Sequence, residues 1–211
     1  GLAGAAKKAG RIAAEGIVVT ALTECGKKAV VVEVNAETDF VAKNEKFQNY
    51  AADVAAQALV TTAANMDEFM AETWAKDTTL TVKEALASQI SIIGENMNIR
   101  RFEPVVEENG CVVSYIHAGG KIGVLIDVVT DVVNDAVKEM AKNVAMQVAA
   151  LRPQYTNNKE VSAEYLEHEK AILMAQIMND PKEAPKPEKV IQGMIAGHIN
   201  KQLKDICLLD Q

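Results

Sequence analysis

The stretch GIVVTALTECGKKAVVVEVN, residues 16–35, decides the fold because a second copy of it occurs later in the chain. That copy, GCVVSYIHAGGKIGVLIDVV, spans residues 110–129 and aligns without a gap at a constant offset of 94 residues. Seven of the twenty aligned positions are identical: Gly16/Gly110, Val18/Val112, Val19/Val113, Gly26/Gly120, Lys27/Lys121, Val30/Val124 and Val34/Val128. The repeat therefore predicts one structural unit that the chain uses twice.

Each copy contains two runs of β-branched residues separated by a turn with glycine, which is the pattern of a β-hairpin. A helical pattern follows each hairpin, because apolar residues recur there at intervals of three and four. After the first copy they are Phe47, Ala51, Val54 and Ala58, and after the second they are Val133, Val137, Met140, Val144, Val148 and Leu151. The predicted unit is a hairpin followed by a helix.

The sequence between the two copies predicts one more helix and one more strand. Residues 81–96, TVKEALASQISIIGEN, begin with a capping box formed by Thr81 and Glu84, and the predicted helix ends at Gly94. Residues 98–106, NIRRFEPVV, have an extended pattern whose proline is tolerated only at an edge or at a strand end. They predict a third strand for the first sheet.

After residue 153 the pattern changes to two helices. Ser162 is a suitable N-cap for the first helix, and Pro187 suits the first turn of the second. The stretch NDPKEAPKP, residues 179–187, separates them. Two helices of similar length joined by a proline-rich turn predict an antiparallel hairpin, which would project as an arm because it can bury its own apolar seam.

The predicted fold class is α+β: two duplicated subdomains, each with a small antiparallel β-sheet packed by helices, plus a projecting antiparallel helical-hairpin (coiled-coil) arm. The Gly/Ala/Lys-rich start is typical of an interdomain linker, so we expect upstream residues to be missing. The expected divisions are a linker from a missing N-terminal domain at 1–15, core subdomain N at 16–107, core subdomain C at 108–155, and the arm with its return segment at 156–211.

Composition and charge argue against several classes of function. The 22 Lys+Arg against 29 Asp+Glu give a net charge of −7, which disfavours direct binding to nucleic acid or to an anionic membrane surface. No apolar run approaches the ~20 residues of a membrane-spanning helix. The three cysteines, Cys25, Cys111 and Cys207, form no CxxC pair, so neither a disulfide scaffold nor a zinc site is indicated, and a reducing compartment fits best.

No catalytic set is evident, so we expect no active site, metal or cofactor. His117, His168 and His198 share no metal-ligand spacing, and no cysteine adjoins a base. Arg100 and Arg101 are neighbours on a predicted strand and face opposite sides, so they cannot act as a pair, and we expect salt bridges instead. His117 precedes the glycine-rich turn HAGGKIG, where a partner-contact residue and a partly buried strand histidine are equally consistent with the sequence.

The stretch EVNAETDFVAKNEKF, residues 33–47, carries a large aromatic residue where a turn is usually polar. Thr38 or Asp39 can serve as the N-cap of a helix. Phe40 precedes Phe47 by seven residues, which would place both rings on one helical face and favours a buried Phe40. The alternative is that a capped helix start presents an aromatic ring and a carboxylate to a partner, as interface hot spots do.

The chain resembles the elongation factor Ts family. The residues that carry the resemblance occur in family order and cover almost the whole chain: AAKKAGRIAAEG (5–16), EVNAETDFVAKNEKF (33–47), IGENMNIRRF (93–102), SYIHAGGKIGVLI (114–126), NVAMQVAALRP (143–153) and CLLDQ (207–211). The resemblance implies two related α+β subdomains with a helical hairpin inserted in the second. The family normally begins with a small three-helix domain and continues past CLLDQ, so we expect this chain to be a fragment.

The resemblance also implies a function. Family members are guanine-nucleotide exchange factors for elongation factor Tu, the GTPase that delivers aminoacyl-tRNA, and they meet it in its GDP-bound and nucleotide-free forms. In the family the TDFV motif enters the GTPase near its nucleotide site, and the histidine of the second hairpin also touches it. The contact residues implied here are Thr38, Asp39, Phe40, Val41 and His117. Such a protein has no catalytic active site of its own.

Two other functions stay open. The chain could be a structural module that self-associates, for example as a homodimer through the helical arm, without exchange activity. A hydrolase that uses His117 is a weaker alternative, because no nucleophile accompanies that residue. We expect a bacterial cytoplasmic protein; an organellar origin is also open, because a missing N-terminus would hide a transit peptide.

Overall fold

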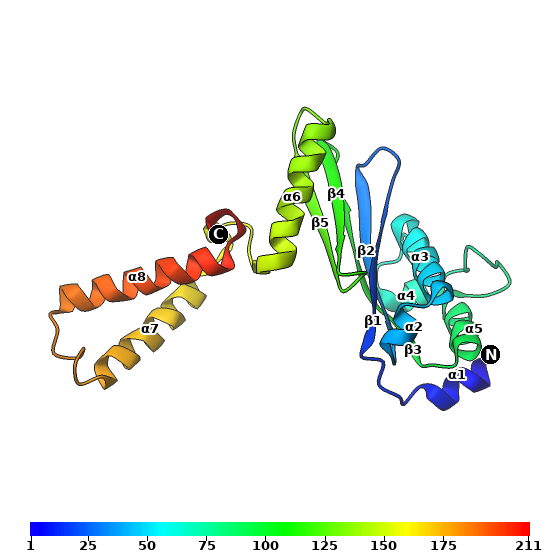
Figure 1. The fold of residues 1–211 in the computed structure, drawn as a ribbon, viewed down its shortest axis with the longest axis horizontal. Coiled ribbons are helices and arrows are strands. Elements are labelled where there is room, and N and C mark those ends of the chain that lie inside the picture. Colours follow the sequence, from blue (N-terminus) through cyan, green and yellow to red (C-terminus); the bar gives the residue numbers. More distant parts are fainter. The chain divides into compact units, whose positions relative to one another are not determined.

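Both copies of the repeat form antiparallel hairpins in the computed structural model, which describes residues 1–211 (Figure 1). The strands of the two hairpins are β1 (Glu15–Leu22), β2 (Lys28–Ala36), β4 (Gly110–His117) and β5 (Ile122–Val129). The helices that follow them are α3 (Glu45–Val60) and α6 (Asp135–Leu151). The hairpins and the helices predicted from the repeat are therefore confirmed.

The third predicted strand is also confirmed. It is β3 (Met97–Val106), which pairs with β2 and completes a three-stranded antiparallel sheet in the order β1-β2-β3. Pro104 lies opposite Val30 on this edge strand, a position where a proline is tolerated. Strands β4 and β5 form a separate two-stranded sheet.

A β-bulge between β2 and β3 corrects the expectation for the two arginines. The pairing register shifts between Glu33 and Val34, which face Arg101 and Ile99, so Arg100 is the extra residue. As a result both arginines reach one carboxylate. The Nε atoms of Arg101 and Arg100 lie 2.7 Å and 3.8 Å from the Glu33 Oε2 atom. The expected salt bridges form, but the two arginines do act as a pair, because the bulge interrupts the alternation of a regular strand.

The two hairpins match in detail at equivalent positions. A side chain at Gly16 would collide with the carbonyl oxygen of Val34, and one at Gly110 would collide with that of Val128. Val34 and Val128 are themselves an equivalent pair in the repeat. The identical glycines thus mark the same close approach of two backbones at the open end of each hairpin.

The main core lies between the three-stranded sheet and helices on one of its faces (Figure 1). These helices are α3, α4 (Met66–Ala71) and α5 (Val82–Ile93). Side chains from β2 and α3 fill the centre and are fully buried, among them Val30, Val32, Val34, Phe47 and Val54. The alternation of buried and less buried residues along β2 fits a strand with one face on this core.

Helix α5 begins and ends where the sequence predicts. The Thr81 hydroxyl accepts a hydrogen bond from the Glu84 N–H, and the Glu84 carboxylate accepts one from the Thr81 N–H, so the capping box is complete. Gly94 ends the helix with a left-handed φ of 88°, a conformation that favours glycine. The chain then turns into β3, and this turn carries Glu95 and Asn96.

The β4–β5 hairpin packs on the other face of the three-stranded sheet, and α6 covers the hairpin (Figure 1). The packing face of α6 only partly coincides with the predicted apolar stripe: Val148 packs on the hairpin, but the fully buried residues are small. Ala141, Ala145 and Ala149 are buried, whereas Met140 and Leu151 are exposed. Small side chains let a helix approach a sheet closely, so the alanines form the contact.

The first residues, where a linker is expected, contain a helix. Leu2–Lys8 form a short helix, α1, and its Ala5 packs on the main core. Alanine-rich composition is typical of linkers and is also the strongest helix-forming composition, so the sequence pattern fits both. Here the small side chains of α1 lie against α5, a contact that local sequence does not reveal.

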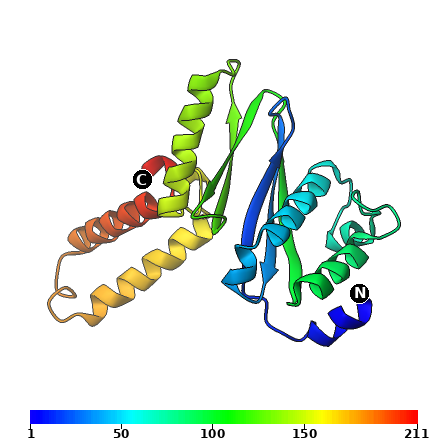
Figure 2. The same ribbon diagram turned by 45° about the vertical axis from the view of Figure 1, so that its right-hand side comes forward.

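The chain divides into two compact units, Gly1–Ala149 and Ala150–Gln211. In the second unit, α7 (Ala163–Asn179) and α8 (Glu188–Ile206) lie side by side in both views (Figure 1 and Figure 2). Ser162 caps α7, as predicted, and Pro187 is the N-cap of α8, one position before the first turn in which it was expected. Two short 3₁₀ helices flank the pair, Asn158–Glu160 and Leu208–Asp210. The seam between α7 and α8 buries Ile177, Ile191, Ile195 and Ile199.

The fold class is α+β with small antiparallel sheets, as expected. Both hairpins of the repeat lie in the first compact unit, and the finer division of the chain at residues 15, 107 and 155 stays a prediction. None of the helices combines the length and the apolar composition that crossing a membrane requires.

Candidate protein-binding site

The TDFV stretch forms a single helical turn, α2 (Asp39–Ala42), shortly after β2 ends. Thr38 is its N-cap, because its hydroxyl oxygen accepts a hydrogen bond from the Val41 N–H at 3.3 Å. Asp39 is the first helical residue. Of the two N-cap candidates in the sequence, the structure therefore selects Thr38.

Phe40 is 83% exposed, whereas Phe47 is fully buried. The interpretation that favoured a buried Phe40 is wrong, because it assumed one continuous helix through both residues. The chain leaves the helical turn at Lys43, and Asn44 caps a new helix, α3. A spacing of seven residues places two side chains on one face only where the helix between them is unbroken.

The inner side of α2 holds the turn in place. Ala42 is buried, and the half-buried Val41 packs on the main core. The side-chain amide of Gln48 donates a hydrogen bond to the Ala42 carbonyl at 3.3 Å. Phe40 lies on the outer side, where its large apolar ring gains burial only when a partner covers it.

Asp39 carries its charge next to Phe40. The Lys43 Nζ atom lies 3.0 Å from Asp39 Oδ2, and this hydrogen bond holds the pKa of the Asp39 carboxyl below its ordinary value. The charge of Lys43 acts in the same direction, and so does the weaker influence of Lys121. The pair is open to water and therefore screened. Asp39 is ionised at neutral pH and can accept hydrogen bonds from a partner.

A second loop clamps the start of this turn. The Glu95 Oε2 atom accepts hydrogen bonds from the backbone N–H groups of Glu37 and Thr38, each at 3.0 Å. Glu95 Oε1 accepts a third from the Thr38 hydroxyl at 2.6 Å. In return, Glu37 Oε1 accepts one from the Asn96 N–H at 2.6 Å. Sequence reasoning missed these partners; the signal was the polar Glu-Asn pair directly after the predicted helix end at Gly94.

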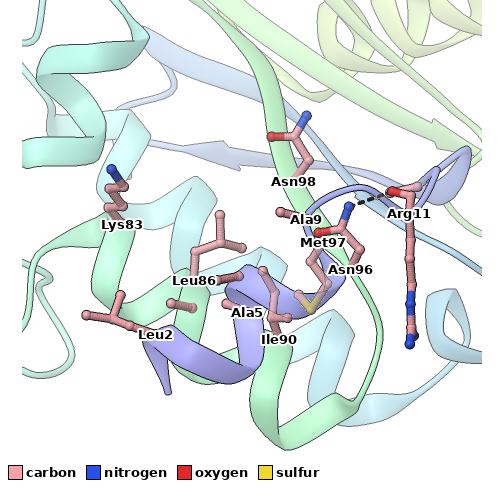
Figure 3. A pocket seen from close by; sticks show the side chains of 13 residues that line it. Leu2, Ala5, Ala9, Arg11, Lys83, Leu86, Ile90, Asn96, Met97 and Asn98 are labelled. Carbon is pink, nitrogen blue, oxygen red and sulfur yellow. Dashed lines mark hydrogen bonds between the residues drawn. The ribbon is translucent and has the colours of Figure 1, made fainter.

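An apolar cavity of about 690 Å³ adjoins the clamp between α1, α5 and the start of β3 (Figure 3). Its apolar walls include Leu2, Ala5, Leu86, Ile90 and Met97. At its edge the Asn96 side chain donates a hydrogen bond to the Arg11 carbonyl at 2.7 Å. The walls carry no converging acid, base and nucleophile. Elsewhere, too, no three His, Cys, Asp or Glu side chains lie close enough to hold a metal ion.

His117 ends β4 and is exposed, so it is not the partly buried strand histidine of the second interpretation. Its Nδ1 atom lies 2.8 Å from the Tyr115 hydroxyl, and this hydrogen bond restrains the ring. The following turn reverses the chain through residues with positive φ, Ala118 to Gly120. The Gly120 carbonyl accepts a hydrogen bond from the Val18 N–H at 2.7 Å, which ties the turn to β1.

The structure brings four of the five predicted contact residues into one turn and leaves His117 on a separate hairpin. No hydrogen bond or ion pair joins His117 to the TDFV turn. Lys121, in the turn after His117, lies near both the start of β1 and the TDFV turn. It forms an ion pair with Glu15 at 3.0 Å, and its charge contributes to the lowered pKa of Asp39. The turn after His117 and the TDFV turn thus lie near the same end of β1.

Comparison with known proteins gives a consistent result. Residues 37–211 match the family described as Elongation factor TS. A relative from Clostridium novyi, named Elongation factor Ts, is 44% identical over 211 residues, which is 100% of this chain and 68% of the relative. The Elongation factor Ts of Trichlorobacter lovleyi is 47% identical over 215 residues, again covering 100% and 68%. That of Clostridioides difficile is 45% identical over 211 residues, 67% of its own length.

Proposed function

The chain belongs to the elongation factor Ts family, and from this premise we propose that it promotes GDP release from elongation factor Tu by inserting its TDFV turn near the Mg²⁺ and phosphate site. The observation that carries the proposal is the 83% exposure of Phe40 on a turn whose other side is packed. An aromatic ring and a charged group on a well-held backbone have the character of an interface hot spot.

The proposed mechanism needs binding and no bond-making. A GTPase holds GDP largely through contacts of the phosphates with Mg²⁺ and with the phosphate loop. A Phe40 ring inserted between switch-region helices would shift the groups that hold the ion and the phosphates, and GDP would leave. Burial of the ring supplies part of the driving force, roughly 1.5–3 kcal/mol for a whole phenylalanine side chain.

Linkage fixes the order of events. If the chain weakens nucleotide binding by some factor, nucleotide weakens the binding of the chain by the same factor. The complex with the nucleotide-free GTPase is therefore the tight one, and the complex with the GDP-bound form is transient. Binding of GTP then releases the exchange factor.

His117 is the proposed second contact. Its ring is exposed, restrained by Tyr115, and carried by a turn that is tied to β1. The TDFV turn also lies near the start of β1, so one partner surface could meet both. Two contacts on different elements orient the wedge better than one, because they remove a rotation about the first contact.

We also propose that the two hairpins mark duplicated subdomains and that α7 and α8 form an inserted arm. The duplication is supported by the matching backbone approach at Gly16 and Gly110. The insertion is supported by the way in which the chain enters and leaves the helix pair. The Leu208 N–H donates to the Tyr155 carbonyl at 2.9 Å, so the segment departs and returns at one point.

The test is the release of a fluorescent GDP analogue from elongation factor Tu. We expect the parent chain to accelerate release and Phe40→Ala to slow it by roughly thirtyfold, the loss that corresponds to about 2 kcal/mol at a hot spot. Val60→Ala is the matched control, because Val60 is another highly exposed apolar residue, at 72%, away from the turn. Asp39→Ala should also slow release.

Two outcomes separate the possibilities. If Phe40→Ala exchanges as fast as the parent while the parent is active, the wedge is wrong. If the parent neither binds nor accelerates release, exchange activity is wrong and self-association becomes the better interpretation. Lys43→Ala is unsuitable as a neutral control, because Lys43 pairs with Asp39.

A further inference from the structure

The orientation of the Phe40 ring depends on the backbone of α2. Its side chain is almost wholly exposed, and α2 has only four residues. A single helical turn is not stable by itself in water, because nucleation fixes several residues for one hydrogen bond. Whatever holds the start of α2 therefore sets the direction in which the ring points.

A continuous chain of hydrogen bonds runs from Glu95 to this turn. The Thr38 hydroxyl donates to Glu95 Oε1 at 2.6 Å and accepts from the Val41 N–H at 3.3 Å, which uses the hydroxyl once as donor and once as acceptor. The backbone N–H groups of Glu37 and Thr38 add two more bonds to the same carboxylate. Hydrogen bonds to an ionised group are the strong ones, so this carboxylate is the main anchor of the N-cap.

We propose that Glu95 is a positioning residue for nucleotide exchange: it holds the N-cap of α2 and thereby presets the direction in which Phe40 meets the GTPase. The inference rests on the proposed function of the TDFV turn. Its physical basis is preorganisation, because a turn that is already fixed loses less conformational entropy on docking. Glu95 acts through Thr38 and needs no contact with the partner.

The loop that carries Glu95 has its own support. Glu37 Oε1 accepts a hydrogen bond from the Asn96 N–H at 2.6 Å and lies 3.6 Å from the Arg11 guanidinium. These contacts remain when the Glu95 carboxylate becomes an amide. The substitution Glu95→Gln should therefore leave the two loops together and loosen mainly the N-cap, since an amide offers one acceptor oxygen where the carboxylate offers two.

The first measurement compares Glu95→Gln with the parent chain in the GDP-analogue assay. We expect release to slow about tenfold, the effect of weakening hydrogen bonds to a charged group. Glu139→Gln is the matched control, because it removes the same charge from an exposed position on α6 and should leave the rate unchanged. A parent-like rate for Glu95→Gln overturns the inference.

The decisive measurement is a double-mutant cycle with Phe40→Ala. If Glu95 acts only by directing the Phe40 ring, its effect requires the ring. Glu95→Gln should therefore slow release almost no further in the Phe40→Ala variant. A direct contact of Glu95 with the GTPase, or a general loss of stability, would instead multiply the two losses. Multiplied losses would count against a positioning role.

A second test changes Thr38, the donor of the hydrogen bond to Glu95 Oε1. Thr38→Val keeps the shape of the side chain without the hydroxyl and should reproduce the loss seen with Glu95→Gln, whereas Thr38→Ser should recover most of it. This pair of variants keeps the inference testable if thermal unfolding shows that Glu95→Gln does not fold. Equal rates for Thr38→Val and Thr38→Ser would overturn it.

The two proposals fail in different ways. An inactive parent chain contradicts the exchange function itself. An active parent, a slow Phe40→Ala variant and a parent-like Glu95→Gln variant would leave the exchange function intact and refute only the positioning role.

Discussion

Asp39 and Lys43 form an ion pair on the exposed side of α2. The hydrogen bond from Lys43, followed by its charge, lowers the pKa of Asp39 below the ordinary 3.8. Because the pKa of Asp39 is lower in the folded state, the pair stabilises the fold at pH values above the pKa of the unfolded state. This contribution is lost as the pH falls through the pKa of the folded state. Around neutral pH, Asp39 therefore adds no pH dependence to exchange.

We predict that Lys43→Gln returns the pKa of Asp39 toward 3.8, because the ammonium that donates the hydrogen bond to Asp39 and carries the positive charge is then removed. An NMR titration of the carboxyl groups measures this shift. Asp77 is the internal control, since hydrogen bonds from Thr79 lower its pKa and Lys43 takes no part. An unchanged Asp39 pKa in the variant would show that the ion pair is not what lowers it.

Tyr50 shows the opposite situation, a polar group in the core. It is buried and packs on Trp74 with ring centroids 5.8 Å apart, and its hydroxyl has no hydrogen-bond partner in the protein. Burial raises the pKa of this phenol, so it stays neutral. A buried hydroxyl without a partner opposes folding, because it gives up its bonds to water.

We therefore predict that Tyr50→Phe leaves the free energy of unfolding unchanged or raises it by up to about 1 kcal/mol, the usual scale of an unmade hydrogen bond. Urea unfolding measures the change. Tyr115→Phe is the comparison, because its hydroxyl bonds to His117 and its removal brings no gain. A loss of stability in Tyr50→Phe would reveal a partner for the hydroxyl.

At the scale of elements, α6 shows that a helical pattern does not identify the packed face. Large apolar residues recur along it, but the buried stripe is Ala141, Ala145 and Ala149. Ala145 and Ala149 pack with the buried Val124 of β5, and partly buried residues of the β4–β5 hairpin and Val148 complete this cluster. The helix lies on its small residues, and its larger ones lie at the margin of the contact.

This arrangement predicts unequal effects for two substitutions on α6. Ala145→Leu should lower the free energy of unfolding by about 1–3 kcal/mol, because added methylenes overfill a close contact. Met140→Ala should change it by less than about 0.5 kcal/mol, because half of that side chain is exposed. Chemical denaturation of both variants measures this, and the reverse order would show that the large residues form the packed face.

At the scale of the whole molecule, the α7–α8 pair bears on the self-association alternative. Its large buried residues face the seam between the two helices, and three of its large apolar residues, Ile172, Met178 and Val190, are exposed. A stable interface normally buries a continuous patch of about 800 Å² on each partner. Three side chains that are each roughly half-exposed supply much less apolar area than that.

We therefore predict that the chain sediments as a monomer both with residues 157–206 and with those residues replaced by a short glycine-rich linker. The adjacent entry and exit points at Tyr155 and Leu208 make the replacement geometrically simple. Analytical ultracentrifugation over a range of concentrations measures the mass. A dimer that disappears with the segment would support self-association through the arm.

The sequence by itself determined the strands and the long helices of this protein. The hairpins follow from the repeat, α5 from its capping box and terminal glycine, β3 from an extended run with an edge proline, and α7 and α8 from their caps and the proline-rich break. Each of these features depends on backbone and side-chain groups only a few residues apart. Interactions between residues that are close in the chain can be inferred from the sequence alone.

Only the tertiary structure decided which side chains are available for function. The exposure of Phe40 depends on a break in the helix at Lys43, and the pairing of Arg100 with Arg101 depends on a bulge opposite Glu33. The clamp on Thr38 joins residues 57 positions apart. Burial and long-range hydrogen bonds depend on which surfaces come into contact when the elements pack. The periodicity of a single sequence does not indicate those contacts.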